Sequence, residues 1–179
     1  MHTSAFDLGE EMNNKVVRYV LHKPLWDNFK QKKYPTIDLS FSNWKTVKYL
    51  KDDASDFHKD VELVPNDKGG LYMFYVKCPL IQGITEYPLY IGRAQLTTSQ
   101  NLRKRVKEYF QHYKKNNERP KITRMIKYWG SELHLAYYEL TTNAQVMSIE
   151  KEIINSTIFE MNDLIPDQKI SQAVKAFNL

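Results

Sequence analysis

Residues Gly69–Gly92 read GGLYMFYVKCPLIQGITEYPLYIG and contain two short apolar runs, Leu71–Lys77 and Leu89–Ile91. Apolar side chains occupy successive positions of the first run, so both of its faces would be buried and the strand would be central in a sheet. The second run is short and ends at Gly92, where we expect the backbone to turn toward a helix. Prolines and a glycine between the runs predict a turn-rich insert over residues 78–88.

The residues that follow alternate between helical and extended patterns. Apolar side chains recur every three or four positions after Asn101 and again after Pro120, which predicts two helices. Alternation over residues 133–138 predicts a third strand, and a Thr-Thr-Asn cap predicts a helix over Ala144–Phe159. Together these patterns predict an α+β fold in which helices flank a small three-stranded antiparallel sheet, with a last amphipathic helix from Lys169.

The chain before residue 69 has a different character. Val16, Val20 and Leu21 recur at helical spacing, and Ser42 could cap a short helix that contains Val47. We therefore expect three segments. They are a mainly helical N-terminal extension (residues 1–68), a core (residues 69–164) and a C-terminal helix packing on that core (residues 165–179).

Composition and charge narrow the possible functions. No apolar run approaches the roughly 20 residues that span a bilayer, and Cys78 is the single cysteine, which excludes an internal disulfide. We expect a cytoplasmic protein with no membrane partner and no organic cofactor. Residues 101–129 contain ten basic and two acidic residues, a local charge of 10 − 2 = +8 in a chain of net charge +5. Such a concentration indicates a polyanionic partner, although a solvated helix face is the alternative.

Five short features occur in one order along the core. They are Gly70-Leu71-Tyr72, Tyr90-Ile91-Gly92, Arg105 in the following helix, Glu150 and Asn162. In type and order they resemble the motifs of the GIY-YIG nuclease superfamily, and the chain is similar to a restriction-endonuclease-like member over residues 69–164. The resemblance implies the GIY-YIG fold and a phosphodiester hydrolase that uses one divalent metal, Mg²⁺ or Mn²⁺.

The resemblance also implies a role for each residue. Glu150 would hold the metal, and Arg105 would stabilise negative charge on the scissile phosphate. Tyr72 would act as the general base or position the attacking water, and Tyr90 would support it or contact phosphate. Asn162 would orient the backbone around the site, or serve only as a helix cap.

Two of these assignments have rivals nearby, and the chain departs from the family at two positions. Arg103 is an alternative to Arg105, and Glu152 is an alternative to Glu150. Many family members carry a lysine after the second motif, and this chain has an arginine there. Several restriction-type members carry a histidine one turn after the motif arginine, and this chain has a tyrosine one turn after Arg105. The residues expected to contact nucleic acid are basic or aromatic: Arg93, Arg103, Lys104, Lys107, Tyr109, Lys121 and Arg124.

These features predict a metal-dependent endonuclease that acts on DNA in host defence or in a mobile element. Cleavage of both strands needs two active sites, so a homodimer is possible. One alternative is a nucleic-acid-binding module that has lost catalysis, and another is an RNA-directed nuclease. The basic helices would serve all three functions.

Overall fold

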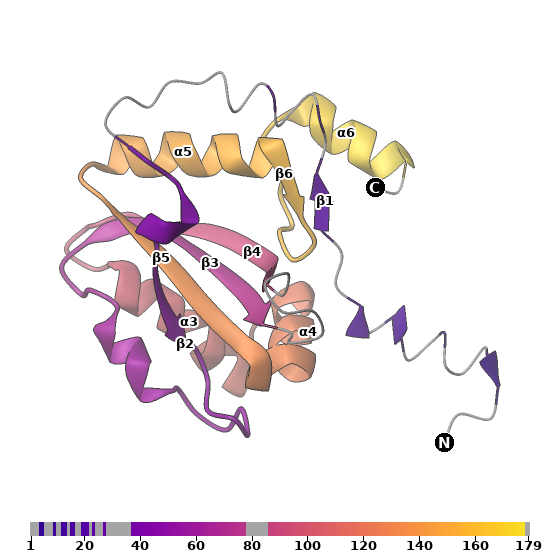
Figure 1. Cartoon of the computed structure of the whole chain (residues 1–179), viewed down its shortest axis with the longest axis horizontal. Coiled ribbons are helices and arrows are strands. Elements are labelled where there is room, and N and C mark those ends of the chain that lie inside the picture. The colour runs from indigo at the N-terminus through magenta and orange to yellow at the C-terminus, as the bar shows by residue number, and fades with distance from the viewer. Residues whose placement is uncertain are drawn as a thin grey trace.

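The computed structural model describes residues 37–77 and 86–177 and, before residue 37, scattered positions that include strand β1 (Tyr19–Leu21). The fold is α+β, with a four-stranded antiparallel sheet between helices (Figure 1). The strand order is β2 (Lys45–Lys48), β5 (Leu133–Leu140), β3 (Gly69–Lys77) and β4 (Glu86–Ala94). Strand β3 is therefore central, as its apolar sequence predicted, and β4 forms one edge.

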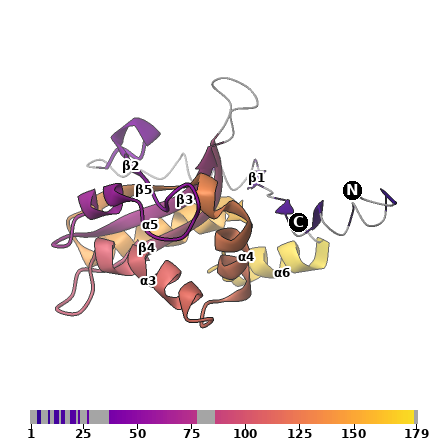
Figure 2. The same cartoon turned by 90° about the horizontal axis from the view of Figure 1, so that it is seen from below.

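Helices cover both faces of this sheet. Figures 1 and 2 show α3 (Leu102–Lys114) and α4 (Pro120–Trp129) on one face and α5 (Asn143–Ser156) on the other. Short 3₁₀ helices span Phe41–Asn43, Lys59–Leu63 and Gly130–Glu132, β6 (Thr157–Phe159) pairs antiparallel with β1, and α6 (Gln168–Phe177) follows. None of the helices in the described part of the chain is long and apolar enough to cross a membrane.

The pleat of β3 divides the core into two layers. Tyr72, Phe74 and Val76 pack in the larger apolar cluster with residues of α3 and α4. Leu71 lies on the opposite face and packs with Val146 and Ile149 of α5. Successive side chains of a strand point to opposite faces, so a single strand of continuous apolar sequence can serve both layers.

Local capping signals explain where the helices begin. The side chain of Asn101 accepts a hydrogen bond from the Lys104 amide at the start of α3, and α4 begins at Pro120, a favoured first helical residue. Thr142 and Gln145 form a reciprocal capping box at the start of α5. These starts agree with the sequence patterns, whereas α5 ends earlier than predicted because Thr157 begins β6.

The sheet has four strands, so the prediction of three was wrong. The additional strand, β2, comes from the segment in which we expected a short helix, and it pairs with β5. Only Val47 of β2 is buried, and so short a segment does not distinguish alternating from helical periodicity. Residues 37–68 are consequently not mainly helical, and Tyr19–Leu21 is a strand where helical spacing was expected. The other residues of that expected helix lie mostly outside the described residues.

Gly92 does not end β4, because the strand continues to Ala94. A Cβ atom at Gly92 would lie 2.5 Å from Oη and 2.6 Å from Cζ of Tyr72, which is its partner on β3. Gly70 is similarly confined, since a Cβ atom there would lie 2.1 Å from the Tyr138 carbonyl oxygen. Both motif glycines therefore allow atoms of the neighbouring strand to approach closely inside the sheet, and neither marks a turn. Most of the expected insert, residues 78–85, lies outside the described residues.

Candidate active site

A cavity of ≈ 360 Å³ lies beside the edge strand β4. Tyr72 of β3, Tyr90 of β4 and Arg105 of α3 reach it from one face of the sheet, whereas Glu150 reaches it from α5 on the other. The remaining lining residues belong to the end of β4 and the loop before α3: Arg93, Ala94, Gln95, Thr97 and Gln100. Four of the five residues predicted to be catalytic therefore meet at one cavity.

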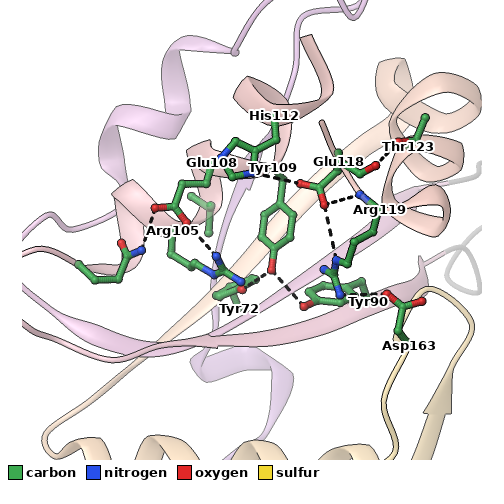
Figure 3. Close-up of polar contacts among 12 residues, drawn as sticks. Tyr72, Tyr90, Arg105, Glu108, Tyr109, His112, Glu118, Arg119, Thr123 and Asp163 are labelled. Atoms are coloured by element: carbon green, nitrogen blue, oxygen red, sulfur yellow. Dashed lines mark hydrogen bonds and ion pairs between the residues drawn. The ribbon is translucent and has the colours of Figure 1, made fainter. Parts of the chain in front are cut away.

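Three tyrosine hydroxyls form a chain, and two of the three tyrosines line this cavity. The Tyr109 hydroxyl lies 2.6 Å from that of Tyr72 and 3.0 Å from that of Tyr90 (Figure 3). Tyr109 is 2% exposed, Tyr72 is 1% exposed and Tyr90 is 7% exposed. A phenol has one proton to donate, so Tyr109 can donate to one of its neighbours while it accepts from the other. Its hydroxyl thus fixes the positions of both cavity tyrosines.

Burial keeps the phenols of Tyr72 and Tyr109 protonated. Desolvation raises the pKa of Tyr72, the neighbouring Tyr90 raises it further, and Arg105 lowers it in part. Burial also raises the pKa of Tyr109, and Tyr72 and Tyr90 add to that effect. A phenolate at Tyr72 is therefore disfavoured in the free protein, and the neutral hydroxyl is the form that the cavity presents.

The guanidinium of Arg105 is held beside this tyrosine cluster, Tyr72–Tyr90–Tyr109. Its Nη1 donates to Oε2 of Glu108 at 2.8 Å, and its Cζ lies 5.1 Å from the centre of the Tyr109 ring. Burial opposes ionisation of Glu108, but hydrogen bonds from Arg105 and Gln100 hold the pKa of its carboxyl below the usual value. Arg103, the alternative, instead donates to the Val64 carbonyl at 2.6 Å and does not line the cavity.

Glu150 is the acidic side chain among the described lining residues, and it is paired with Arg93. Nη1 of Arg93 donates to Oε2 of Glu150 at 2.9 Å, and the Glu150 side chain is 16% exposed. Burial raises the pKa of the Glu150 carboxyl, and Arg93 opposes this rise. Glu152, the alternative, does not line the cavity.

Among the described lining residues, Glu150 offers a metal ion the one carboxylate of the cavity. Within residues 37–77 and 86–177, no three histidine, cysteine, aspartate or glutamate side chains gather in a metal-binding group. One carboxylate suits a hard cation such as Mg²⁺, which keeps several water ligands and binds through one or two carboxylates together with substrate phosphates. Glu150 is thus the residue that could hold it.

Asn162 anchors the edge strand and does not line the cavity. Its Oδ1 accepts from the Ile91 amide at 3.0 Å, and its Nδ2 donates to the Ile91 carbonyl at 2.8 Å, as a neighbouring strand would. Asn143 binds the backbone of Leu96 in the same way, at 2.9 and 3.0 Å. Sequence reasoning missed this second anchor, because Asn143 was read only as part of a helix cap.

Most residues expected to contact nucleic acid have partners within the chain. Glu62 pairs with both Arg103 and Lys107, and Glu160 pairs with Arg124. Lys104 donates to the carbonyl of Ser99, and Lys121 donates to the carbonyl of Asn162. Tyr109 is buried, which corrects our expectation, since it has almost no surface to offer a polymer. The positive charge of α3 and α4 is therefore partly neutralised by acids distant in the sequence.

Arg119 is a further cation beside the tyrosine cluster. Its Cζ lies 5.7 Å from the centre of the Tyr90 ring, and its Nη1 donates to Oδ2 of Asp163 at 3.0 Å. Figure 3 shows Arg105 and Arg119 on opposite sides of Tyr109. The sequence placed Arg119 in the basic segment but carried no signal of its proximity to Tyr90.

No family model matches the sequence, and neither a curated protein nor a solved structure matches it significantly. Roles for the cavity residues therefore follow from their chemistry and their positions.

Proposed function

We propose that this protein is a metal-dependent endonuclease with the GIY-YIG fold that hydrolyses phosphodiester bonds in DNA. One observation carries the proposal. Tyr72, Tyr90, Arg105 and Glu150 come from four different elements, were selected from the sequence by their resemblance to one nuclease pattern, and line a single cavity. We also propose that this nuclease acts in host defence, in a restriction-like role, or in a mobile element.

The cavity has the groups that recognition of a phosphodiester requires. Arg93 and Arg105 are both lining residues, and a guanidinium can bind two phosphate oxygens at once. Tyr72 and Tyr90 add hydroxyls that can donate to a phosphate oxygen. Preorganised donors of this kind stabilise charge that develops in the transition state, and Glu108 holds Arg105 in place for that purpose.

Hydrolysis forms a bond between phosphorus and a water oxygen and breaks the bond between phosphorus and one ester oxygen. The water loses a proton and the leaving alkoxide gains one, so the step is balanced. Arg105 would bind the phosphate oxygens as their charge increases. Tyr72, a neutral phenol, would position the water. A divalent ion held by Glu150 would supply Lewis-acid activation of the phosphate and lower the pKa of the water.

Cleavage of supercoiled plasmid and of unmodified phage DNA with Mg²⁺ or Mn²⁺ tests the proposal. Wild-type protein should give nicked, linear or discrete products, and Glu150→Gln should abolish them. Glu152→Gln is the matched control, because it makes the same charge change on the same helix outside the cavity lining. Equal cleavage by wild type and Glu150→Gln would remove Glu150 from the reaction.

One observation favours a second candidate function, a binding module without catalysis. Glu150 is the acidic residue among the described lining residues, and its carboxylate is already paired with Arg93. DNA binding with no cleavage across several divalent ions would establish that module. Cleavage of RNA alone would identify an RNA-directed nuclease. A protein that sediments only as a monomer on DNA would contradict the homodimer.

A further inference from the structure

Taking Glu150 as the metal ligand, as the proposed function holds, we infer that Arg93 competes with the divalent ion for this carboxylate. The free protein would then bind Mg²⁺ or Mn²⁺ weakly, and a phosphodiester that binds Arg93 would release Glu150 for the metal. Arg93 would be a positioning residue that makes metal capture depend on the substrate.

The contact between the two side chains carries this inference. The Arg93 guanidinium lies 2.9 Å from Oε2 of Glu150, so it already occupies one of the two oxygens that a metal would use. The Glu150 side chain is 16% exposed and the Arg93 side chain is 39% exposed. Arg93 is therefore the partner that has room to leave, while Glu150 stays at the cavity wall.

The charges around the cavity also favour weak metal binding by the free protein. Its charged lining residues, among those that the structure describes, are Arg93, Arg105 and Glu150, which sum to 2 − 1 = +1. Glu108 lies behind Arg105 and is hydrogen bonded to it and to Gln100, so it offers the cavity no free carboxylate. A site of net positive charge attracts an anion more readily than a cation.

A bound phosphodiester changes both the pairing of Glu150 with Arg93 and the net charge of the cavity. It offers Arg93 a competing anionic partner with bidentate geometry, and its own oxygen adds a negative ligand beside Glu150. The metal and the diester should therefore each raise the affinity of the other, because coupling between two binding events is reciprocal. In the free protein, Arg105 has its own partner, Glu108.

Mn²⁺ binding followed by electron paramagnetic resonance tests the inference without any turnover. Arg93→Gln should bind Mn²⁺ about tenfold more tightly than wild type, as expected from the loss of one competing charge-assisted hydrogen bond. Lys127→Gln is the matched control, since it removes one exposed positive charge from α4 outside the cavity and should leave Mn²⁺ affinity at the wild-type value. Adding Glu150→Gln to the Arg93→Gln protein should abolish the gain. Arg93→Lys keeps the charge and should bind Mn²⁺ as weakly as wild type.

Dimethyl phosphate serves as an uncleaved diester for the second half of the test. It should raise the Mn²⁺ affinity of wild type by more than it raises that of Arg93→Gln. Equal Mn²⁺ affinity of wild type and Arg93→Gln, equal enhancement in both, or no Mn²⁺ binding by either protein would overturn the inference. The proposed nuclease function fails separately, if wild-type protein with metal does not cleave nucleic acid.

Discussion

Replacement of Tyr109 by phenylalanine isolates the hydroxyl that joins the tyrosine cluster. The ring stays, so the packing of a side chain that is 2% exposed is kept, and two hydrogen bonds of 2.6 and 3.0 Å are lost. Each such bond contributes about 1 kcal/mol net. Two such bonds are lost, and both partners belong to residues that line the cavity, so we expect a loss of about 1–2 kcal/mol in the free energy of unfolding.

Tyr49→Phe is the matched control for this change. Tyr49 is 0% exposed, and its hydroxyl donates to the Val106 carbonyl at 2.6 Å, away from the cavity lining. Its loss should cost about 1 kcal/mol of stability. The two variants therefore lose similar stability, but only Tyr109→Phe releases the residues that we place around the phosphate.

Urea unfolding and single-turnover cleavage of plasmid DNA measure the two effects separately. Misplacement of a catalytic group by about 1 Å can lower a rate by about a hundredfold, so we expect Tyr109→Phe to slow cleavage at least about tenfold. Tyr49→Phe should cleave within about twofold of wild type below the unfolding transition. Wild-type cleavage by Tyr109→Phe, or an equal loss in both variants, would refute the positioning role of Tyr109.

Three further changes test the surroundings of the cavity. Gly92→Ala places a Cβ atom 2.5 Å from the Tyr72 hydroxyl, so urea unfolding should show a loss of about 1–3 kcal/mol and cleavage should fall sharply. Asn162→Ala removes both bonds to the Ile91 backbone, and should cost about 2 kcal/mol and speed hydrogen exchange of the Ile91 amide. Burial raises the pKa of the Glu150 carboxyl above its ordinary value of 4.5, so the folded state binds this proton more tightly than the unfolded state does. The stability of the wild type therefore falls as pH rises from 4.5 toward the higher pKa of the folded state. Thermal unfolding should therefore show Glu150→Gln to be more stable than wild type at neutral pH, with the difference lost at about pH 4.

The sequence was sufficient to predict the elements whose signals are local. The central strand β3 followed from its continuous apolar run, and α3 and α4 followed from Asn101 and Pro120 at their starts. Strand β2 was missed because it is four residues long and gains its order from pairing with β5, which is far away in the sequence. Pairing of this kind is a tertiary effect that overrides local propensity.

The candidate site was predicted better by pattern than by charge. Tyr72, Tyr90, Arg105 and Glu150 were selected by their type and order, and they meet at one cavity. Charge summed along α3 and α4 exaggerated the basic character of this region, because the chain brings acids such as Glu62 against it. Burial and ion pairing depend on neighbours that a window of sequence does not contain.

The position of the cavity at the edge strand explains why these residues can meet. In the middle of a sheet, side chains on opposite faces are separated by the backbone, but beyond an edge strand they can converge. Tyr72 lies on the central strand β3 and reaches that edge because its partner Gly92 has no side chain. The glycine of the second motif and the tyrosine of the first are therefore one structural unit, and a change in the size of either would displace the hydroxyl from the cavity that Arg105 and Glu150 reach from opposite faces of the sheet.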